Sequence, residues 1–211
     1  MGNCADKSQE KHEGEIDQIV PPHPDFKKQS IQTATQDYAP SQVSLRLHSE
    51  NTYFGDVKEH KANGKGKYVT QEYEYEGEWI NGRPNGNGKI VYKNGTIYEG
   101  HFINGQPDGK GEFKASDGFW YKGDFHNGKF YGKGEAIWPN GSKYKGEFKM
   151  GVFHGDGEYT WSDGRVFKGT YKGGVKDGVG IVLLPDGKQF EGKWVSGDLI
   201  GELVLKNKTQ N

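Results

Sequence analysis

A repeated unit of 22 or 23 residues runs through most of this sequence and constrains its fold more than any other feature. One copy, residues 121–141, reads YKGDFHNGKFYGKGEAIWPNG. A fixed period in this range is typical of repeat arrays, in which each unit buries its apolar face against its neighbours. Aligning the sequence with itself places the starts of the units at Tyr53, Tyr75, Tyr98, Tyr121, Tyr144, Phe167 and Phe190.

Each unit has the residue pattern of a β-hairpin. The segment YEGEW (75–79) alternates aromatic or glycine residues with charged ones, which is typical of a strand with one apolar and one polar face. Asn81-Gly82 follows, and such pairs favour positive φ and tight turns. A second strand over 88–92 then ends in another Asn-Gly turn. The sequence therefore predicts an all-β fold, an elongated single-layer antiparallel meander sheet of repeated β-hairpins.

The composition changes outside the repeats. Residues 1–41 are polar, acidic and proline-containing, without sustained periodicity, which predicts a disordered N-terminal leader. Val43, Leu45 and Leu47 alternate with polar residues, so residues 42–52 are predicted to form a strand that caps the array. The array itself is predicted over 53–205, followed by a polar tail at 206–211.

The chain has 34 glycines among 211 residues, and many lie within predicted strands. Glycine weakens a strand and needs a local reason there. Gly77, Gly86 and Gly88 share the parity of the aromatic residues. We interpret all three as making room for Tyr75 and Trp79, whose rings would lie over neighbouring backbone.

The aromatic residues of the predicted inner face fall into rows. We expect most of them to form the core, and we predict that one row lines a groove for a partner. Trp120 is the best candidate for a protruding contact because it lies outside the repeated aromatic positions. The predicted groove residues are Trp79, Phe102, Trp120, Phe125, Phe148, Tyr171 and Trp194. A second row is expected beside them, formed by Ile90, Phe113, Ala136, Tyr159, Val182 and Leu205.

The first four residues, Met1-Gly2-Asn3-Cys4, fit an acylation signal. Gly2 is the acceptor position for N-myristoylation, and Cys4 is placed for palmitoylation, although Asp6 stands where Ser or Thr is usual. One myristoyl chain binds membranes only marginally, so stable anchoring requires a second signal. The leader is acidic, which leaves Cys4 as that signal. The alternative, that Met1-Gly2 occurs by chance, stays open.

Several function classes are disfavoured. The seven histidines show no metal-ligand spacing, there is only one cysteine, and no nucleophile elbow, P-loop or kinase motif is present. We therefore predict no enzyme activity, no metal and no cofactor. The net charge of -1 gives no general attraction to nucleic acid, and we predict no nucleic-acid partner. No apolar run is long enough for a transmembrane helix.

The repeated unit resembles the MORN repeat (membrane occupation and recognition nexus), whose pattern is Tyr-x-Gly-x-Trp-x-x-Gly-x-x-x-Gly-x-Gly followed by Asp-Gly or Asn-Gly. Six nearly complete copies and a degenerate first one cover 53–205. The departures are His60, which replaces a glycine of the first unit, and Leu203, which replaces one in the last. The family includes junctophilins and radial spoke head proteins, and the resemblance implies a twisted antiparallel sheet used for scaffolding, dimerisation and peptide binding.

The resulting hypothesis is a non-enzymatic scaffold or adaptor, tethered by N-terminal acylation to the cytosolic face of a membrane. It would recruit a protein partner, a helix or an extended peptide, through the repeat groove, with a homodimer through open strand edges as a further option. One alternative is a ciliary or cytoskeletal assembly protein of the radial-spoke-head type. The other is direct phospholipid binding, which the resemblance suggests and for which Lys122, Lys145 and Lys168 are the candidate contacts. Acidic residues flank that row of lysines, which disfavours the lipid alternative.

Overall fold

A computed structural model describes residues 51–206 and the backbone of residues 42–46. The predicted leader, including Gly2 and Cys4, and residues 207–211 lie outside the described residues. Within them, no helix is long and apolar enough to cross a membrane. The strands are β1 (Gln42–Arg46), β2 (Thr52–Lys58), β3 (Lys61–Val69), β4 (Tyr73–Ile80), β5 (Arg83–Tyr92), β6 (Ile97–Ile103), β7 (Gln106–Lys114), β8 (Trp120–His126), β9 (Lys129–Ile137), β10 (Lys143–Lys149), β11 (Val152–Thr160), β12 (Val166–Lys172), β13 (Val175–Leu183), β14 (Gln189–Val195) and β15 (Asp198–Lys206).

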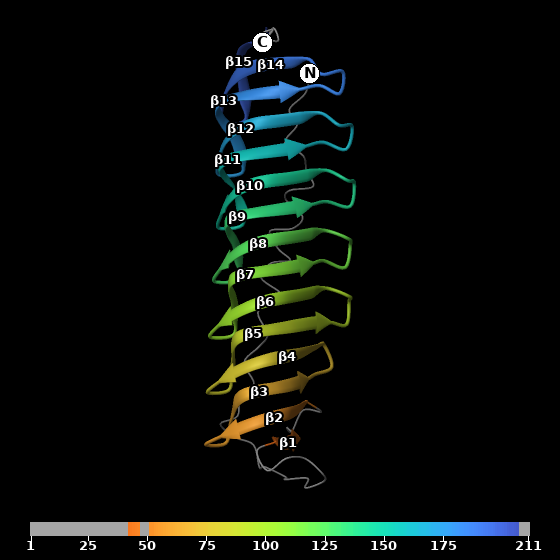
Figure 1. The fold of residues 1–211 in the computed structure, drawn as a ribbon, viewed down its shortest axis with the longest axis vertical. Coiled ribbons are helices and arrows are strands. Elements are labelled where there is room, and N and C mark those ends of the chain that lie inside the picture. The colour runs from red at the N-terminus through yellow and green to blue at the C-terminus, as the bar shows by residue number, and fades with distance from the viewer. Residues whose placement is uncertain (1–41, 47–50, 207–211) are drawn as a thin grey trace, which may run out of the picture. The chain divides into compact units, whose positions relative to one another are not determined.

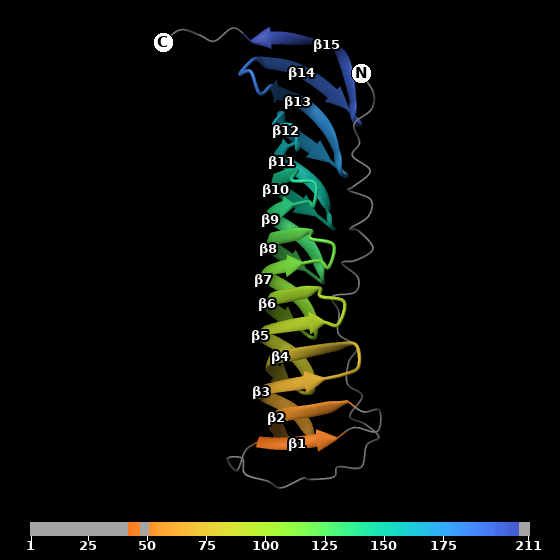
Figure 2. The same ribbon diagram turned by 90° about the vertical axis from the view of Figure 1, so that its right-hand side faces the viewer.

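The strands form a single open sheet in which their order follows the chain from β1 to β15 (Figure 1). The described pairs are antiparallel, and Figure 2 shows the same succession of hairpins from the side. This confirms the predicted all-β antiparallel meander. β1 pairs with β2, at the place where we predicted the capping strand of 42–52.

The described residues divide into two compact units. The N-terminal unit contains 42–46, 51–116 and Phe125–Gly128, and the C-terminal unit contains Asp117–Asp124 and 129–206. Each unit contains consecutive hairpins built on the same pattern, so the packing of one unit is explained in the same terms as that of the other.

Two-residue turns close the hairpins, as the Asn-Gly pairs predicted. Asn81 and Gly82 have φ values of 51° and 81°, and Asn104 and Gly105 have values of 51° and 87°. Such turns match the twist of paired strands. The amide of the second turn residue also donates to the preceding hairpin, for example from Gly105 N to Pro84 O at 2.8 Å. Hydrogen bonding between successive hairpins therefore extends to the turns.

A row of glycines crosses each unit and lies under the first aromatic of each repeat. Gly77 and Gly88 are opposite each other in β4 and β5, and a Cβ on either would lie 2.5 Å or less from the Tyr75 hydroxyl. That hydroxyl donates to the carbonyl of Glu78 at 3.1 Å. The predicted need for room is therefore confirmed for these two glycines, and the ring that occupies the room is that of Tyr75.

Gly86 has a different role from the predicted one. Its φ is 106°, which L side chains rarely adopt, and it lies within a β-bulge of its own strand, where residues 85–87 of β5 stand opposite Glu78 alone. Glu78 fills the space in front of it and accepts a hydrogen bond from Asn87 N at 2.7 Å. The conformation of the backbone, rather than room for a ring, requires glycine here.

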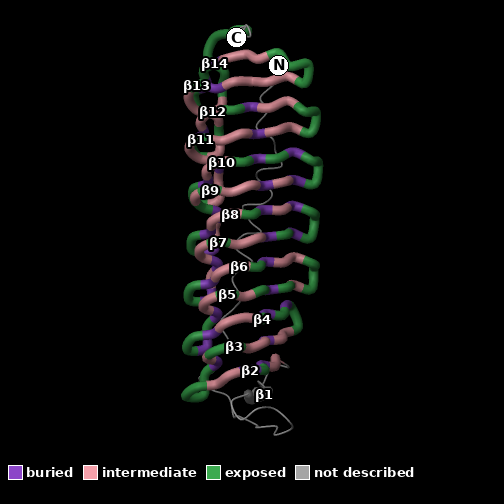
Figure 3. Tube along the Cα trace, viewed as in Figure 1, coloured by how far each residue is buried: buried purple, intermediate pink, exposed green. Residues whose placement is uncertain are grey.

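The core lies on the face of the sheet that carries the aromatic rows, here called the inner face. Buried positions recur at the same points of successive strands (Figure 3). In β6 the pattern along the strand places Tyr98 and Phe102 in the core and leaves Glu99 and Ile103 exposed. The charged side chains therefore lie on the opposite face, here called the outer face, where they are exposed to solvent.

Candidate functional site

The predicted groove residues, apart from Trp120, are core residues of the inner face. Their exposed fractions run from 0% for Phe102 to 6% for Trp194. Phe102 packs edge-on against Tyr75 and Tyr98, with ring centroids 5.2 and 5.1 Å apart. Each such ring therefore joins one hairpin to the next. A binding role for these residues stays a prediction, and their burial leaves little surface for a partner to contact.

Trp120 differs from the other predicted groove residues because it begins β8 immediately before the buried Tyr121. Side chains of neighbouring strand residues point to opposite faces, so Trp120 belongs to the outer face. It is half-buried there. Among the candidates from the sequence, it is the one whose ring can meet a partner without opening the core.

The sequence did not single out Phe130 and Phe153, which lie in second strands of the C-terminal unit. Phe130 stacks on Tyr121 and Phe153 on Tyr144, each with centroids 3.7 Å apart. The same repeat position holds Ala62, Pro84 and Pro107 in the N-terminal unit. Because this position varies between repeats, the common pattern gave no signal. The local change from Ala or Pro to Phe was the signal available.

Lys176 occupies the same position in a later repeat. Its ammonium group lies 4.7 Å from the ring centroids of Trp161 and Phe167 and 5.9 Å from that of Trp194. Attraction between a cation and the face of a ring favours this arrangement. The aromatic surface at this point of the inner face is thus covered by a side chain of the chain itself.

The candidate lipid contacts Lys122, Lys145 and Lys168 lie on the outer face among carboxylates. Lys168 Nζ is 2.8 Å from Glu158 Oε2, and Lys145 lies opposite Glu135 on one side and Glu158 on the other. Opposite charges on adjacent strands pair across the sheet. The structure leaves lipid binding by these lysines untested and places acidic partners beside two of them.

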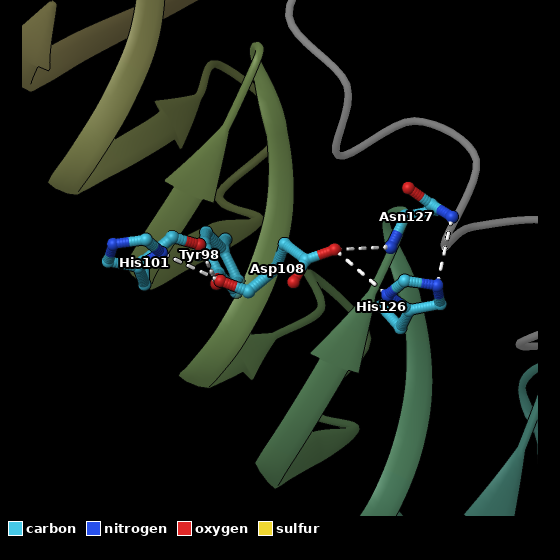
Figure 4. Close-up of polar contacts among 5 residues, drawn as sticks. All are labelled: Tyr98, His101, Asp108, His126 and Asn127. Atoms are coloured by element: carbon cyan, nitrogen blue, oxygen red, sulfur yellow. Dashed lines mark hydrogen bonds and ion pairs between the residues drawn. The ribbon is translucent and has the colours of Figure 1, made fainter.

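A polar cluster on the N-terminal unit joins two hairpins through one carboxylate (Figure 4). Asp108 Oδ2 lies 3.0 Å from His126 Nδ1 and accepts the amide of Asn127 at 3.1 Å. The carbonyl of Asp108 lies 2.9 Å from His101 Nδ1, and Tyr98 donates to the carbonyl of His101 at 3.0 Å. These contacts hold the turn at Asn127 against β7, which is a structural role. No group of three or more potential metal ligands occurs among the described residues.

Comparison with known families identifies the repeats. A family model described as the MORN repeat matches residues 53–71, 75–97, 98–119, 121–143, 144–164 and 167–189, which together are more than half of the chain. The chain belongs to the MORN-repeat family. The predicted unit that begins at Phe190 has no match, although the meander continues there with β14 and β15.

Two solved structures are similar to the chain at 15% sequence identity. One is the TCP domain of SAS-4 (dCPAP) of Drosophila melanogaster in complex with a proline-rich motif of Ana2 (dSTIL), with a TM-score of 0.33 over 83% of this chain and 97% of that one. The other is a mutant TCP10 domain of Danio rerio CPAP, with a TM-score of 0.37 over 76% of this chain and 87% of that one. Such scores do not identify a shared function. A comparison with curated proteins found no match.

Proposed function

We propose that this MORN-repeat protein is a non-enzymatic scaffold that recruits a protein partner through the array and is held at the cytosolic face of a membrane by acylation of Gly2 and Cys4. The observation that carries the scaffold role is the packing between hairpins. Within each unit, rings such as Phe102 contact the aromatic residues of two successive hairpins. Exposed side chains are therefore held at fixed spacings, as a binding scaffold requires.

Trp120 is the proposed centre of the partner-binding surface. Tryptophan combines a large apolar area with low conformational entropy, and it is common at the centres of interfaces. Quantitative co-purification from the cells that express the protein tests this role, with Trp120→Ala compared with Tyr131→Ala as a matched control. Tyr131 is an exposed aromatic residue of β9, also in the C-terminal unit. We expect specific proteins to be lost with Trp120→Ala and retained with the control. An unchanged set in both variants would contradict the proposal.

Membrane tethering rests on Gly2 and Cys4, since two acyl chains anchor a protein far more stably than one. Intact-mass spectrometry of the protein from its own cells, with Gly2→Ala as control, measures the modification. We expect a myristoyl mass and a thioester-linked chain on the unsubstituted protein, and release of Gly2→Ala from the membrane fraction. An unmodified mass would remove the membrane from the proposal and leave the ciliary or cytoskeletal alternative for the same scaffold.

Direct phospholipid binding by the array is distinguished by charge reversal. If Lys122, Lys145 and Lys168 bind anionic headgroups, changing all three to Glu abolishes sedimentation of the non-acylated protein with vesicles that contain phosphatidylinositol phosphates. The ion pair between Lys168 and Glu158 leads us to expect no sedimentation in either case. Sedimentation that depends on the three lysines would favour the lipid alternative.

A further inference from the structure

The last described strand, β15, presents an unusual surface. It ends the strand order of the sheet, and β14 is its only paired neighbour among the described residues. All nine of its residues are exposed. Five of them are large and apolar, with exposed fractions from 38% to 66%: Leu199, Ile200, Leu203, Val204 and Leu205. An open strand with apolar side chains is a template for pairing with another strand.

Earlier repeats show what normally covers a strand in this position. Gly86 and Gly178, which occupy the position of Gly201, face Phe102 and Trp194 of the next hairpin. Gly201 keeps the positive φ of these glycines, at 80°, but β15 has no facing strand on this side among the described residues. By the register of the earlier repeats, the position opposite Gly201 is that of an aromatic residue, and the described residues do not supply one.

The other inner-face positions of β15 give the same result. Ile90 and Tyr159, which correspond to Leu205, are 0% and 3% exposed, whereas Leu205 is 51% exposed. Leu203 replaces the glycine that elsewhere underlies a tyrosine ring, and its Cδ2 would lie 2.8 Å from a Cβ on Gly192. Leu203 thus fills the space inside its own hairpin. The uncovered part of β15 is its free strand edge, the side away from β14, from Gly201 to Leu205.

We propose that β15 binds an extended segment of a partner protein as an additional antiparallel strand. The register of β6 on β5, in which Phe102 faces Gly86 and Gly100 faces Gly88, defines the segment. It carries an aromatic residue opposite Gly201, a small residue opposite Leu203 and an apolar residue opposite Leu205. This inference rests on the proposed scaffold function and gives it a second binding site with a stated partner chemistry.

Charge specifies one more position of the partner. Asn87 of β5 faces His101 of β6, and Glu202 is its counterpart in β15. The Glu202 carboxylate is exposed and makes no ion pair within the described part of the chain. A basic residue of the incoming strand lies opposite it, since opposite charges on adjacent strands stabilise pairing. The partner segment therefore reads, from its N-terminus, apolar, any residue, small, basic, aromatic.

The labelled peptide Phe-Thr-Gly-Lys-Trp, extended by polar residues at both ends, is the probe. Fluorescence anisotropy with the full chain measures binding, and hydrogen exchange locates it. We expect saturable binding and slower exchange at residues 198–206. Replacing the Trp of the peptide with Ala weakens binding about tenfold, because the ring that covers Gly201 is lost. No saturable binding, or protection confined to other strands, overturns the proposal.

A charge swap tests the register. Glu202→Lys weakens binding of the Lys peptide about threefold, and a peptide with Glu in place of Lys restores it. Glu72→Lys, the same change in an exposed loop, leaves both peptides unaffected. Equal effects of the two variants overturn the register.

Two further outcomes separate this inference from the Trp120 proposal and from self-association of the chain. Trp120→Ala, which tests the scaffold's other surface, leaves peptide binding at β15 unchanged, so the two proposals succeed or fail separately. If, without added peptide, hydrogen exchange at β15 slows as the protein concentration rises, a second copy is the occupant. That result would overturn the proposal of a heterologous partner strand.

Discussion

At the scale of single residues, the fold depends on a ring placed over a pair of glycines. Tyr121 is fully buried, and its ring lies against Gly123 and Gly134. Its hydroxyl donates to the carbonyl of Asp124 at 2.8 Å. The aromatic residue and the glycines are thus one structural feature, and substitution of either partner should affect the packing of both.

Gly134→Ala is expected to destabilise the protein much more than Gly141→Ala. A Cβ on Gly134 would lie 2.5 Å from the Tyr121 hydroxyl, so the ring must move, at about 3 kcal/mol. Gly141 has φ 83° but nothing within 4 Å of its Cβ, so alanine there costs about 1 kcal/mol of backbone strain. Urea denaturation of both variants measures the difference. Equal losses would show that contact with the Tyr121 ring is not the reason for glycine at position 134.

At the scale of strands and turns, the hairpins close through residues in the left-handed conformation. Asn or Gly is suited to these turns, and the first positions include Asn81, Asn104, Asn127 and Gly173. Met150 and Ser196 depart from this in the C-terminal unit, and Met150 is the apolar one: its φ is 55° and its side chain is 60% exposed. A long apolar side chain here gains little from burial and retains the strain of positive φ.

Met150→Asn should therefore stabilise the protein, and Asn81→Met should destabilise it by a similar amount. Each change is expected to shift the free energy of unfolding by about 0.5–1 kcal/mol, in opposite directions, because asparagine tolerates positive φ better than methionine. Thermal or urea unfolding of both variants provides the measurement. A loss of stability with Met150→Asn would indicate that Met150 makes a contact worth more than the strain it carries.

The sequence predicted the positions of strands and turns better than the packing and exposure of the surfaces. Alternation around Tyr75 and the Asn81-Gly82 pair define strands and turns, because both depend on local geometry alone. The role of Gly86 could not be read in this way, since its positive φ belongs to a bulge of β5 that is seen only once β5 is paired with β4. Periodicity shows which face a residue occupies but not how closely that face is packed.

The candidate site shows the same limit. Phe102 was assigned to a groove from its face, yet only the packing of its two neighbouring tyrosines reveals that it is 0% exposed. Trp120 could be singled out because it departs from the repeat, and its place on the outer face keeps it a candidate. The exposure of β15 required the register of the sheet, since Leu205 is apolar like its buried counterparts Ile90 and Tyr159.

At the scale of the whole molecule, the burial of tyrosines makes the folded state lose stability at high pH. Burial is the main cause that raises the pKa of tyrosines in both units far above the ordinary value of 10.0. They include Tyr53, Tyr73, Tyr75, Tyr92, Tyr98, Tyr144 and Tyr171. Folding therefore favours the protonated phenol, and this contribution is fully present below the pKa of the unfolded chain.

The protein is expected to lose stability steeply as the pH rises above about 10. The unfolded state then releases phenolic protons that the folded state retains, so each buried tyrosine lowers the free energy of unfolding by about 1.4 kcal/mol per pH unit. The loss continues up to the raised folded-state pKa values. Urea denaturation at a series of pH values gives the slope, and tyrosinate absorbance should appear together with the loss of β-sheet circular dichroism.

Tyr98→Phe isolates the contribution of one phenol. The Tyr98 hydroxyl donates to the carbonyl of His101 at 3.0 Å, so its loss costs about 1 kcal/mol at neutral pH. Above pH 10, however, the variant should lose stability less steeply than the unsubstituted protein. The difference in slope is about 1.4 kcal/mol per pH unit, because the variant has one buried phenol fewer. The two stability curves therefore approach each other as the pH rises. Tyrosinate absorbance that develops while the circular dichroism is unchanged would contradict this account, because it would mean that the phenols ionise inside the folded array.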